Sequence, residues 1–252
     1  FVYAALPGEP AFGPPAFMHR EAILDSPEAP ISHHWLDSTH IAFGVVTAGI
    51  VHDRFKVEVS RFNGREPDQH RWNIETGPLD STAIRLSVNP TRTLSLQGSW
   101  GRFEDPEQLE PGVDQKRWSA SALWADEVVP GWKLAGTLAW GRKSAKDHHG
   151  EWLKDDAFVA EGSLKHGPWT AFARGEVTEN RELLDLHGGE HGPAFTVGKV
   201  SAGVVRDFRI ADHLALGLGG QLAVNFVPDV LRNEYGSSNP VGAMGFLRLK
   251  VD

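Results

Sequence analysis

Apolar and polar residues alternate with a period of two along most of the chain. In residues 92–103, Leu94 and Trp100 fall on one face of an extended segment and Ser95 falls on the other. Alternation of this kind predicts a β-strand with one apolar and one polar face. Runs with helical spacing and caps at both ends are scarce, and the one short helix that the pattern allows is around residues 19–24.

The breaks between these strands form a second pattern. Turn residues such as Asn89-Pro90-Thr91 separate paired strands, and longer polar stretches separate one pair from the next. We expect short turns at 52–54, 90–92, 128–131, 166–168 and 209–212. We expect long connections at 7–38, 63–79, 104–114, 144–154, 179–194 and 227–240. With terminal strands at 1–6 and 241–251, the chain would contain about twelve strands.

The strict alternation of short and long connections indicates the fold. Outer-membrane barrels have short periplasmic turns, long external loops and an even number of strands. Sandwiches with Greek-key connections have no reason to alternate in this way. We therefore predict an all-β fold, a transmembrane antiparallel up-and-down β-barrel of about 12 strands that forms a single domain over residues 1–252. Within it, the connection 7–38 is long enough to fold inward as a plug or constriction.

The nine tryptophans support this interpretation. In the predicted barrel, aromatic residues fall at two levels of the outward face, one near the short turns and one near the long loops. Trp132 and Trp140 lie in one strand at a spacing that corresponds to roughly 20 Å of height for a tilted strand. That height approaches the apolar band of about 25 Å that aromatic girdles border in membrane barrels.

A soluble all-β protein, either a sandwich or a ligand-binding barrel, is the structural alternative. It would show the same alternation with its apolar face inside, so alternation alone does not identify the inward face. The loop lengths and the two tryptophan levels favour the membrane barrel. The absence of an apolar run of about 20 residues argues only against a membrane-spanning helix.

Charge and composition limit the kinds of partner and of site that the protein can have. Acidic residues outnumber basic ones, 33 to 25, and the formal net charge of -8 argues against nucleic-acid binding. The chain has no cysteine, which excludes disulfides, thiolate metal sites and cysteine nucleophiles. The expected partners are outer-membrane lipid and small hydrophilic solutes or ions.

Five stretches of the sequence stand out together: GEPAFGPPAFMHR at 8–20, SHHWLDSTHIAFGVV at 32–46, FNGREPDQHRW at 62–72, LDSTAIRLSVNPT at 79–91 and PEQLEPGVD at 106–114. They resemble a family of Gram-negative outer-membrane β-barrel proteins of unknown activity. The resemblance implies localisation in the outer membrane of a Gram-negative bacterium. It also implies a signal peptide and further residues upstream of Phe1, so that the N-terminus would be truncated. It thins after Asp155 and implies no catalytic residue.

Charged residues on the predicted inward faces form the first candidate site. They are Lys56, Glu58, Arg85, Glu161, Arg174, Glu176, Lys199 and Arg248. Charges of both signs in a lumen either pair across it and occlude it, or line a water path. Because both signs are present, we expect no strong preference for anions or cations. The resulting hypothesis is a porin-like channel that is not an enzyme and requires no cofactor.

Histidines form the second candidate site. His33, His34, Asp37 and His40 are close in sequence, and such side chains can bind Zn²⁺ or Cu²⁺. Their spacing matches no standard ligand motif, and the alternative role is packing and hydrogen bonding at the barrel mouth. A non-conducting binding or structural barrel linked to this metal site is the alternative to a channel. Further histidines fall in predicted external loops, where we expect them to be solvated: His148, His149, His187 and His191.

Serines beside these histidines leave a third hypothesis, a lipid-active enzyme. Residue types found in a hydrolytic triad are supplied by Ser32, Ser38, His33, His34 and His40. A triad requires a nucleophile, a base and an orienting group that converge in space. The chain has no G-x-S-x-G motif, and convergence is not readable from the sequence.

Overall fold

Twelve β-strands form one antiparallel sheet in the computed structural model, which describes residues 1–68, 70, 72–107, 111–146, 150–184 and 192–251, and only the backbone of His40. Each strand pairs with the next along the chain, from the first to the last. The strands are β1 (Val2–Ala5), β2 (Val45–His52), β3 (Phe55–Phe62), β4 (Ser81–Val88), β5 (Leu94–Phe103), β6 (Gln115–Val129), β7 (Trp132–Lys146), β8 (Trp152–His166), β9 (Trp169–Asn180), β10 (Phe195–Ala211), β11 (Leu214–Phe226) and β12 (Val241–Val251). The prediction of an all-β, up-and-down antiparallel fold is confirmed.

Short and long connections alternate as predicted, although several strands extend further than expected. The strands β6, β7 and β8 each have 15 residues. The connection between β7 and β8 is therefore shorter than the predicted 144–154, because strand structure continues to Lys146 and resumes at Trp152. Polar residues such as Ser144, Lys146 and Lys154 interrupt the apolar pattern at these strand ends, so hydropathy no longer marks them as strand.

Helices are few and short in the described residues: η1 (Phe17–His19), α1 (His33–Leu36), η2 (Ser38–Ile41), η3 (Asp229–Leu231) and α2 (Arg232–Tyr235). The helix expected at 19–24 is wrong, because Arg20 has an extended backbone that ends η1. His40 lies in η2 and does not open a strand as expected. Among the described residues, no helix has the length and apolar character needed to cross a membrane.

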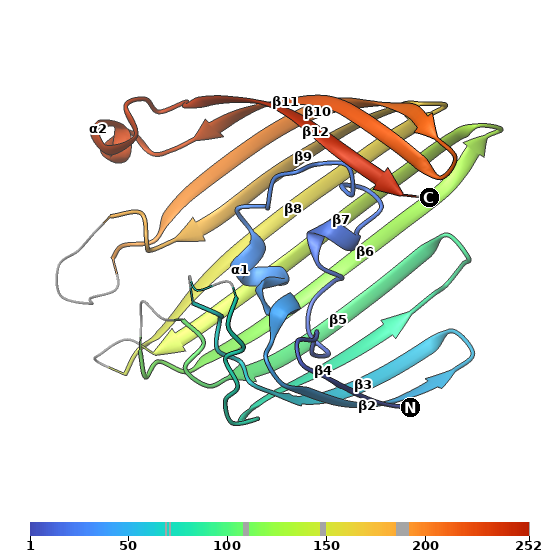
Figure 1. Ribbon diagram of the computed structural model, residues 1–252. Coiled ribbons are helices and arrows are strands. Elements are labelled where there is room, and N and C mark those ends of the chain that lie inside the picture. The colour runs from blue at the N-terminus through green and yellow to red at the C-terminus, as the bar shows by residue number, and fades with distance from the viewer. Residues whose placement is uncertain (69, 71, 108–110, 147–149, 185–191, 252) are drawn as a thin grey trace.

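The sheet curves around the connection between β1 and β2. Figure 1 shows this blue segment, with α1, inside the curve between β2–β5 and β9–β12. Hydrogen-bonded ladders join every pair of sequence neighbours, and none joins β12 to β1 within the described residues. The two termini accordingly lie at opposite edges of the curved sheet.

Burial identifies the inward face of the curved twelve-stranded sheet, called the wall below. Outward residues are apolar and exposed, as for Leu138 at 63% and Leu222 at 64%. Inward residues are polar and buried, as for Ser60 at 0% and Arg174 at 2%. A soluble barrel or sandwich has the opposite arrangement, with its apolar face in the interior. The wall is therefore built with the polarity of a lipid-facing barrel and not with that of a soluble one.

Candidate functional site

Residues 8–39, called the inner segment below, lie against the polar face of the sheet. Each of the three buried apolar clusters joins part of this segment to the wall. The anchors and their partners are Phe12 with Phe62 and Phe103, Ile23 with Phe172 and Val205, and Trp35 with Ala139 and Val159. Glycine permits the last contact, because a Cβ on Gly141 of β7 would lie 2.5 Å from the Trp35 carbonyl oxygen. The segment is therefore packed into the interior at three separate places.

Arg20 is the central polar anchor of the inner segment. Its Nε and Nη2 atoms donate to the two carboxylate oxygens of Glu161 at 2.7 and 2.6 Å. Its Nη1 atom donates to Asp37 at 2.5 Å and to the carbonyl oxygen of Pro15 at 3.1 Å. The same Glu161 carboxylate lies 3.4 Å from Nε of Arg174. A buried guanidinium is thus matched by two carboxylates, one from the wall and one from the segment itself.

Glu28 is a second polar anchor of the inner segment, and its charge is opposite to that of Arg20. Its carboxylate accepts hydrogen bonds from Lys199 of β10 and from the side-chain amide of Gln221 on β11. Its carbonyl oxygen accepts two more from Arg174, at 3.1 and 3.0 Å. Ser26 also donates to Gln221, at 2.9 Å. These contacts tie the segment to three neighbouring strands.

The remaining predicted lumen residues also lie on the inward face. Glu176 accepts from the hydroxyl of Ser32 at 2.9 Å. Arg85 donates to Glu58 at 2.9 Å and to the carbonyl oxygen of Gly13 at 3.1 Å. Gly13 has a φ of +72°, which favours glycine, and a Cβ there would meet the Leu36 carbonyl oxygen.

Lys56 and Arg248 complete the predicted set. Nζ of Lys56 lies 3.1 Å from Glu58 on its own strand. Arg248 pairs with Asp207 of β10 at 2.9 Å and with Asp25 of the inner segment. All eight predicted residues thus face inward, and six of them contact the segment directly: Arg85, Glu161, Arg174, Glu176, Lys199 and Arg248.

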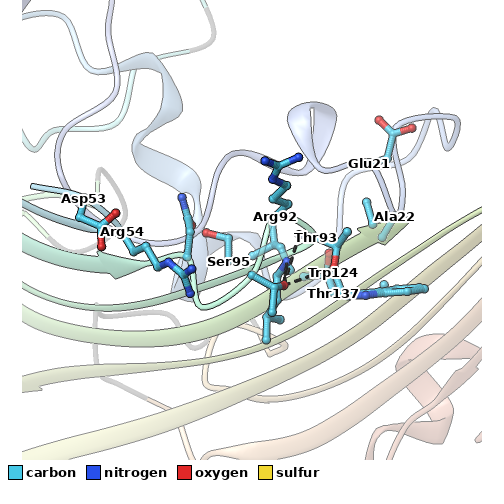
Figure 2. A pocket seen from close by; sticks show the side chains of 15 residues that line it. Glu21, Ala22, Asp53, Arg54, Arg92, Thr93, Ser95, Trp124 and Thr137 are labelled. Atoms are coloured by element: carbon cyan, nitrogen blue, oxygen red, sulfur yellow. Dashed lines mark hydrogen bonds between the residues drawn. The ribbon is translucent and has the colours of Figure 1, made fainter. Parts of the chain in front are cut away.

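A cavity remains on the short-turn side of the inner segment. It has a volume of about 630 Å³ and is lined by residues of the segment, of the short turns and of the inward strand faces. Figure 2 shows Arg92 projecting from the sheet on the side where Glu21 and Ala22 lie, with Asp53 and Arg54 further along the pocket. The lining carries charges of both signs. The interior is therefore filled by the inner segment and hollow on the side of the segment that faces the short turns.

The predicted histidine cluster divides between two environments at the long-loop end. Nδ1 of His33 lies 2.5 Å from Asp37, the carboxylate that also binds Arg20. Nδ1 of His34 instead lies 3.4 Å from Glu66 and 3.5 Å from Glu107. The side chain of His40 is outside the described part of the chain, as are the loop histidines at 148, 149, 187 and 191. The structure thus brings His33 together with Asp37 and directs His34 elsewhere.

Electrostatics couple the groups around His34. The Glu107 carboxylate raises the pKa of His34, which burial would by itself lower. Burial would raise the pKa of Glu107, but His34, Arg117 and Lys143 outweigh it and hold that pKa far below its usual range. Arg117 donates to Glu107 at 2.8 Å, and Lys143 lies 3.8 Å away. The neighbouring charges therefore favour the ionised form of Glu107.

The two candidate serines are engaged by other groups. The Ser32 hydroxyl donates to Glu176, and the Ser38 hydroxyl accepts from Arg117 at 2.9 Å. In the described residues neither hydroxyl is hydrogen-bonded to a histidine. Among the described side chains, these serines are thus not assembled with a histidine into the nucleophile and base that a hydrolytic triad needs.

Sequence reasoning missed the partners that the inner segment supplies. Arg20, Asp25 and Glu28 were not singled out, although a charge signal was present. Between residues 8 and 39 the only Lys or Arg is Arg20, against five acidic residues. The predicted lumen set has the opposite bias, with five basic and three acidic members. This complementarity between one loop and the inward strand faces points to docking.

Comparisons with known proteins support the barrel fold. No family model and no curated protein matches the chain. The anion-selective porin from Comamonas acidovorans is similar in structure, with a TM-score of 0.51 and 13% sequence identity. That match covers 83% of this chain and 56% of the porin, so the chain spans little more than half of the porin's length. A second porin matches with a TM-score of 0.53 and 12% identity, over 98% of this chain and 77% of its own.

Proposed function

We propose that the chain is an outer-membrane channel for small hydrophilic solutes or ions, and that the inner segment restricts passage. The observation that supports this proposal is the reversal of burial in the wall. The outward face is apolar and exposed, which suits lipid, and the inward face carries polar groups and charges of both signs, which suit water. The similarity of the fold to porins supports the same localisation and the same class of function.

The contacts of the inner segment suit a restriction that can move. The described polar contacts between the segment and the wall are hydrogen bonds and ion pairs, so water can replace them without breaking a covalent bond. The wall groups that now hold the segment, such as Arg174 and Glu176, would line the path once it moved. Local opening of this kind draws on the free energy of a few contacts and not on that of the whole barrel.

A non-conducting barrel is the second candidate, and the burial of Arg20 favours it. Both Arg20 and Glu161 have fully buried side chains, and removing one partner of a buried ion pair typically costs about 3–5 kcal/mol. If the segment never leaves, the protein serves a structural or binding role in the outer membrane. Conductance distinguishes the two candidates directly.

Planar-bilayer recording of the purified chain tests the proposal. The double variant Arg20→Ala/Glu161→Gln removes both charges of the central pair, so neither is left buried alone. We expect infrequent openings of the unmodified protein and several-fold more frequent openings of the double variant. Arg209→Ala, in the exposed pair with Asp212, is the matched control and should behave like the unmodified protein. Silence of all three proteins would refute the channel, and equal conductance of all three would refute the restriction.

A further inference from the structure

Three segments that are far apart in the sequence meet beside α1 at the long-loop end. His34 comes from the inner segment, Glu66 from the connection between β3 and β4, and Glu107 from the connection between β5 and β6. One ligand atom from each residue, a ring nitrogen and two carboxylate oxygens, lies within 4.8 Å of the other two. Glu107 is buried, and the other two are partly buried.

The spacing of these atoms suits an ion between them better than direct hydrogen bonds. The distances of 3.4 and 3.5 Å from Nδ1 of His34 exceed the 2.7–2.9 Å or so of a charge-assisted hydrogen bond. The buried Nδ1 atom makes no hydrogen bond within the described residues. A tetrahedral ion with bonds of about 2.1 Å holds its ligand atoms roughly 3.4 Å apart, which matches the two separations measured from Nδ1 of His34.

The surroundings of Glu107 orient it for such a role. Its Oε1 atom accepts from Arg117 at 2.8 Å, while Oε2 is the atom that faces His34. Ligating carboxylates are commonly held by outer hydrogen bonds of this kind. Arg117 and Lys143 also offset the negative charge of Glu107, which limits the affinity for a cation. The neighbouring Asp37 is unsuited to the same ion, because it is already paired with Arg20 and His33.

We propose that His34, Glu66 and Glu107 bind one divalent transition-metal ion of the Zn²⁺ type, with water in the open coordination position. Nitrogen and carboxylate ligands in this ratio suit Zn²⁺. The ion would join the inner segment to two external loops and so fasten the segment at the barrel mouth. This ligand set shares only His34 with the cluster suggested by sequence spacing, since Glu66 and Glu107 replace His33, Asp37 and His40.

Calorimetric titration of the tag-free full chain in detergent with ZnCl₂ tests the site. We expect one ion per chain, with affinity at least tenfold weaker in His34→Ala and in Glu66→Gln. Two controls should bind like the unmodified protein: His33→Ala, which alters the adjacent imidazole, and His52→Ala, at the exposed end of β2. Heat-dependent migration in gel electrophoresis verifies that each variant is folded.

Each alternative outcome overturns the assignment. Absence of Zn²⁺ binding by the unmodified chain would leave only an ion pair between His34 and the carboxylates. A loss in His33→Ala with none in His34→Ala would return the site to the cluster around Asp37. Equal binding by all variants would place the ion elsewhere, for example on the loop histidines. Substitution of Co²⁺ for Zn²⁺ adds a readout of coordination geometry, because four-coordinate Co²⁺ absorbs visible light much more strongly than six-coordinate Co²⁺. We expect the strong absorption of four-coordinate Co²⁺, and the weak absorption of the six-coordinate ion would contradict the proposed site.

Discussion

Arg20 and Glu161 are 141 residues apart in the chain, yet they meet through two hydrogen bonds on the inner face of the curved sheet. The bidentate geometry fixes the orientation of the guanidinium as well as its position. Neither side chain is reachable by solvent, so both depend on buried partners for their stability in the charged form, which are each other, Asp37 for Arg20 and Arg174 for Glu161.

We expect Glu161→Gln to destabilise the protein by about 3 kcal/mol, at the lower end of the range for a broken buried pair. The reason is that Asp37 remains as a partner of Arg20 and partly compensates for the loss. Urea unfolding followed by tryptophan fluorescence measures the change. Arg209→Ala, in a pair that is 74% and 91% exposed, should shift stability by less than about 0.5 kcal/mol. An equally small effect of Glu161→Gln would show that the pair does not hold the segment.

The attachment of the inner segment should resist moderate acid. Burial would raise the pKa of Asp37, but the hydrogen bond with His33 and the charge of Arg20 outweigh it and lower that pKa. A lowered folded-state pKa means that the contribution of Asp37 is fully present above its ordinary value of about 3.9 and is lost as pH falls through the lowered pKa. Pepsin cleavage within the segment should therefore begin only below about pH 4.

Asp37→Asn provides the control for this pH dependence. It removes the titrating group, so cleavage should occur at every pH at which pepsin is active. At pH 6, where pepsin is inactive, thermolysin provides the same readout. Release of the segment near pH 6 in the unmodified protein would contradict the assignment and would point to histidines instead.

A disulfide between segment and wall should close the passage. The amide nitrogen of Ala11 lies 2.7 Å from the hydroxyl oxygen of Ser60, and both residues are buried. Because the chain has no cysteine, Ala11→Cys/Ser60→Cys introduces one pair that cannot mispair. We expect oxidation to reduce the frequency of openings several-fold and reduction to restore it. Ala11→Cys alone should respond to neither treatment, and a double variant that conducts equally in both states would exclude movement of this part of the segment.

An arginine substitution on the outward face should impair folding into a membrane more strongly when it lies near the middle of the membrane than near its border. Leu222 of β11 pairs with Ala202 and Ala243 near the middle of the wall, while Leu216 lies towards the short turns. An arginine costs about 2–4 kcal/mol at the midplane of a barrel's lipid face and about 0–1 kcal/mol near its borders. Leu222→Arg should therefore reduce folding into lipid vesicles far more than Leu216→Arg. Equal effects of the two substitutions would argue against the proposed lipid contact.

The sequence predicted the wall well because strand faces are a local property. The bounds of β3 and the turn before it follow from alternation within a dozen residues. The facing ends of β7 and β8 were harder to predict, because strand hydrogen bonding continues past the apolar belt through residues such as Ser144, Lys146 and Lys154. Side chains there no longer differ from those of a loop.

The interior contacts were less accessible to sequence reasoning. Inward-facing charges on strands could be selected from period and sign, as for Arg174 and Lys199. Their partners on the inner segment could not, because Glu28 meets Lys199 across 171 residues of chain. A segment without regular secondary structure has no periodicity that would say which of its side chains face the wall.

The inner segment and the cavity beside it make the two ends of the lumen unequal. One end opens directly into a hollow of about 630 Å³, and the other meets packed side chains at once. In the channel proposed above, an ion driven by voltage from the hollow end would accumulate before the obstruction, whereas an ion from the other end would have no such reservoir. We therefore expect such a channel to rectify current, so that its conductance depends on the polarity of the potential as well as on its size.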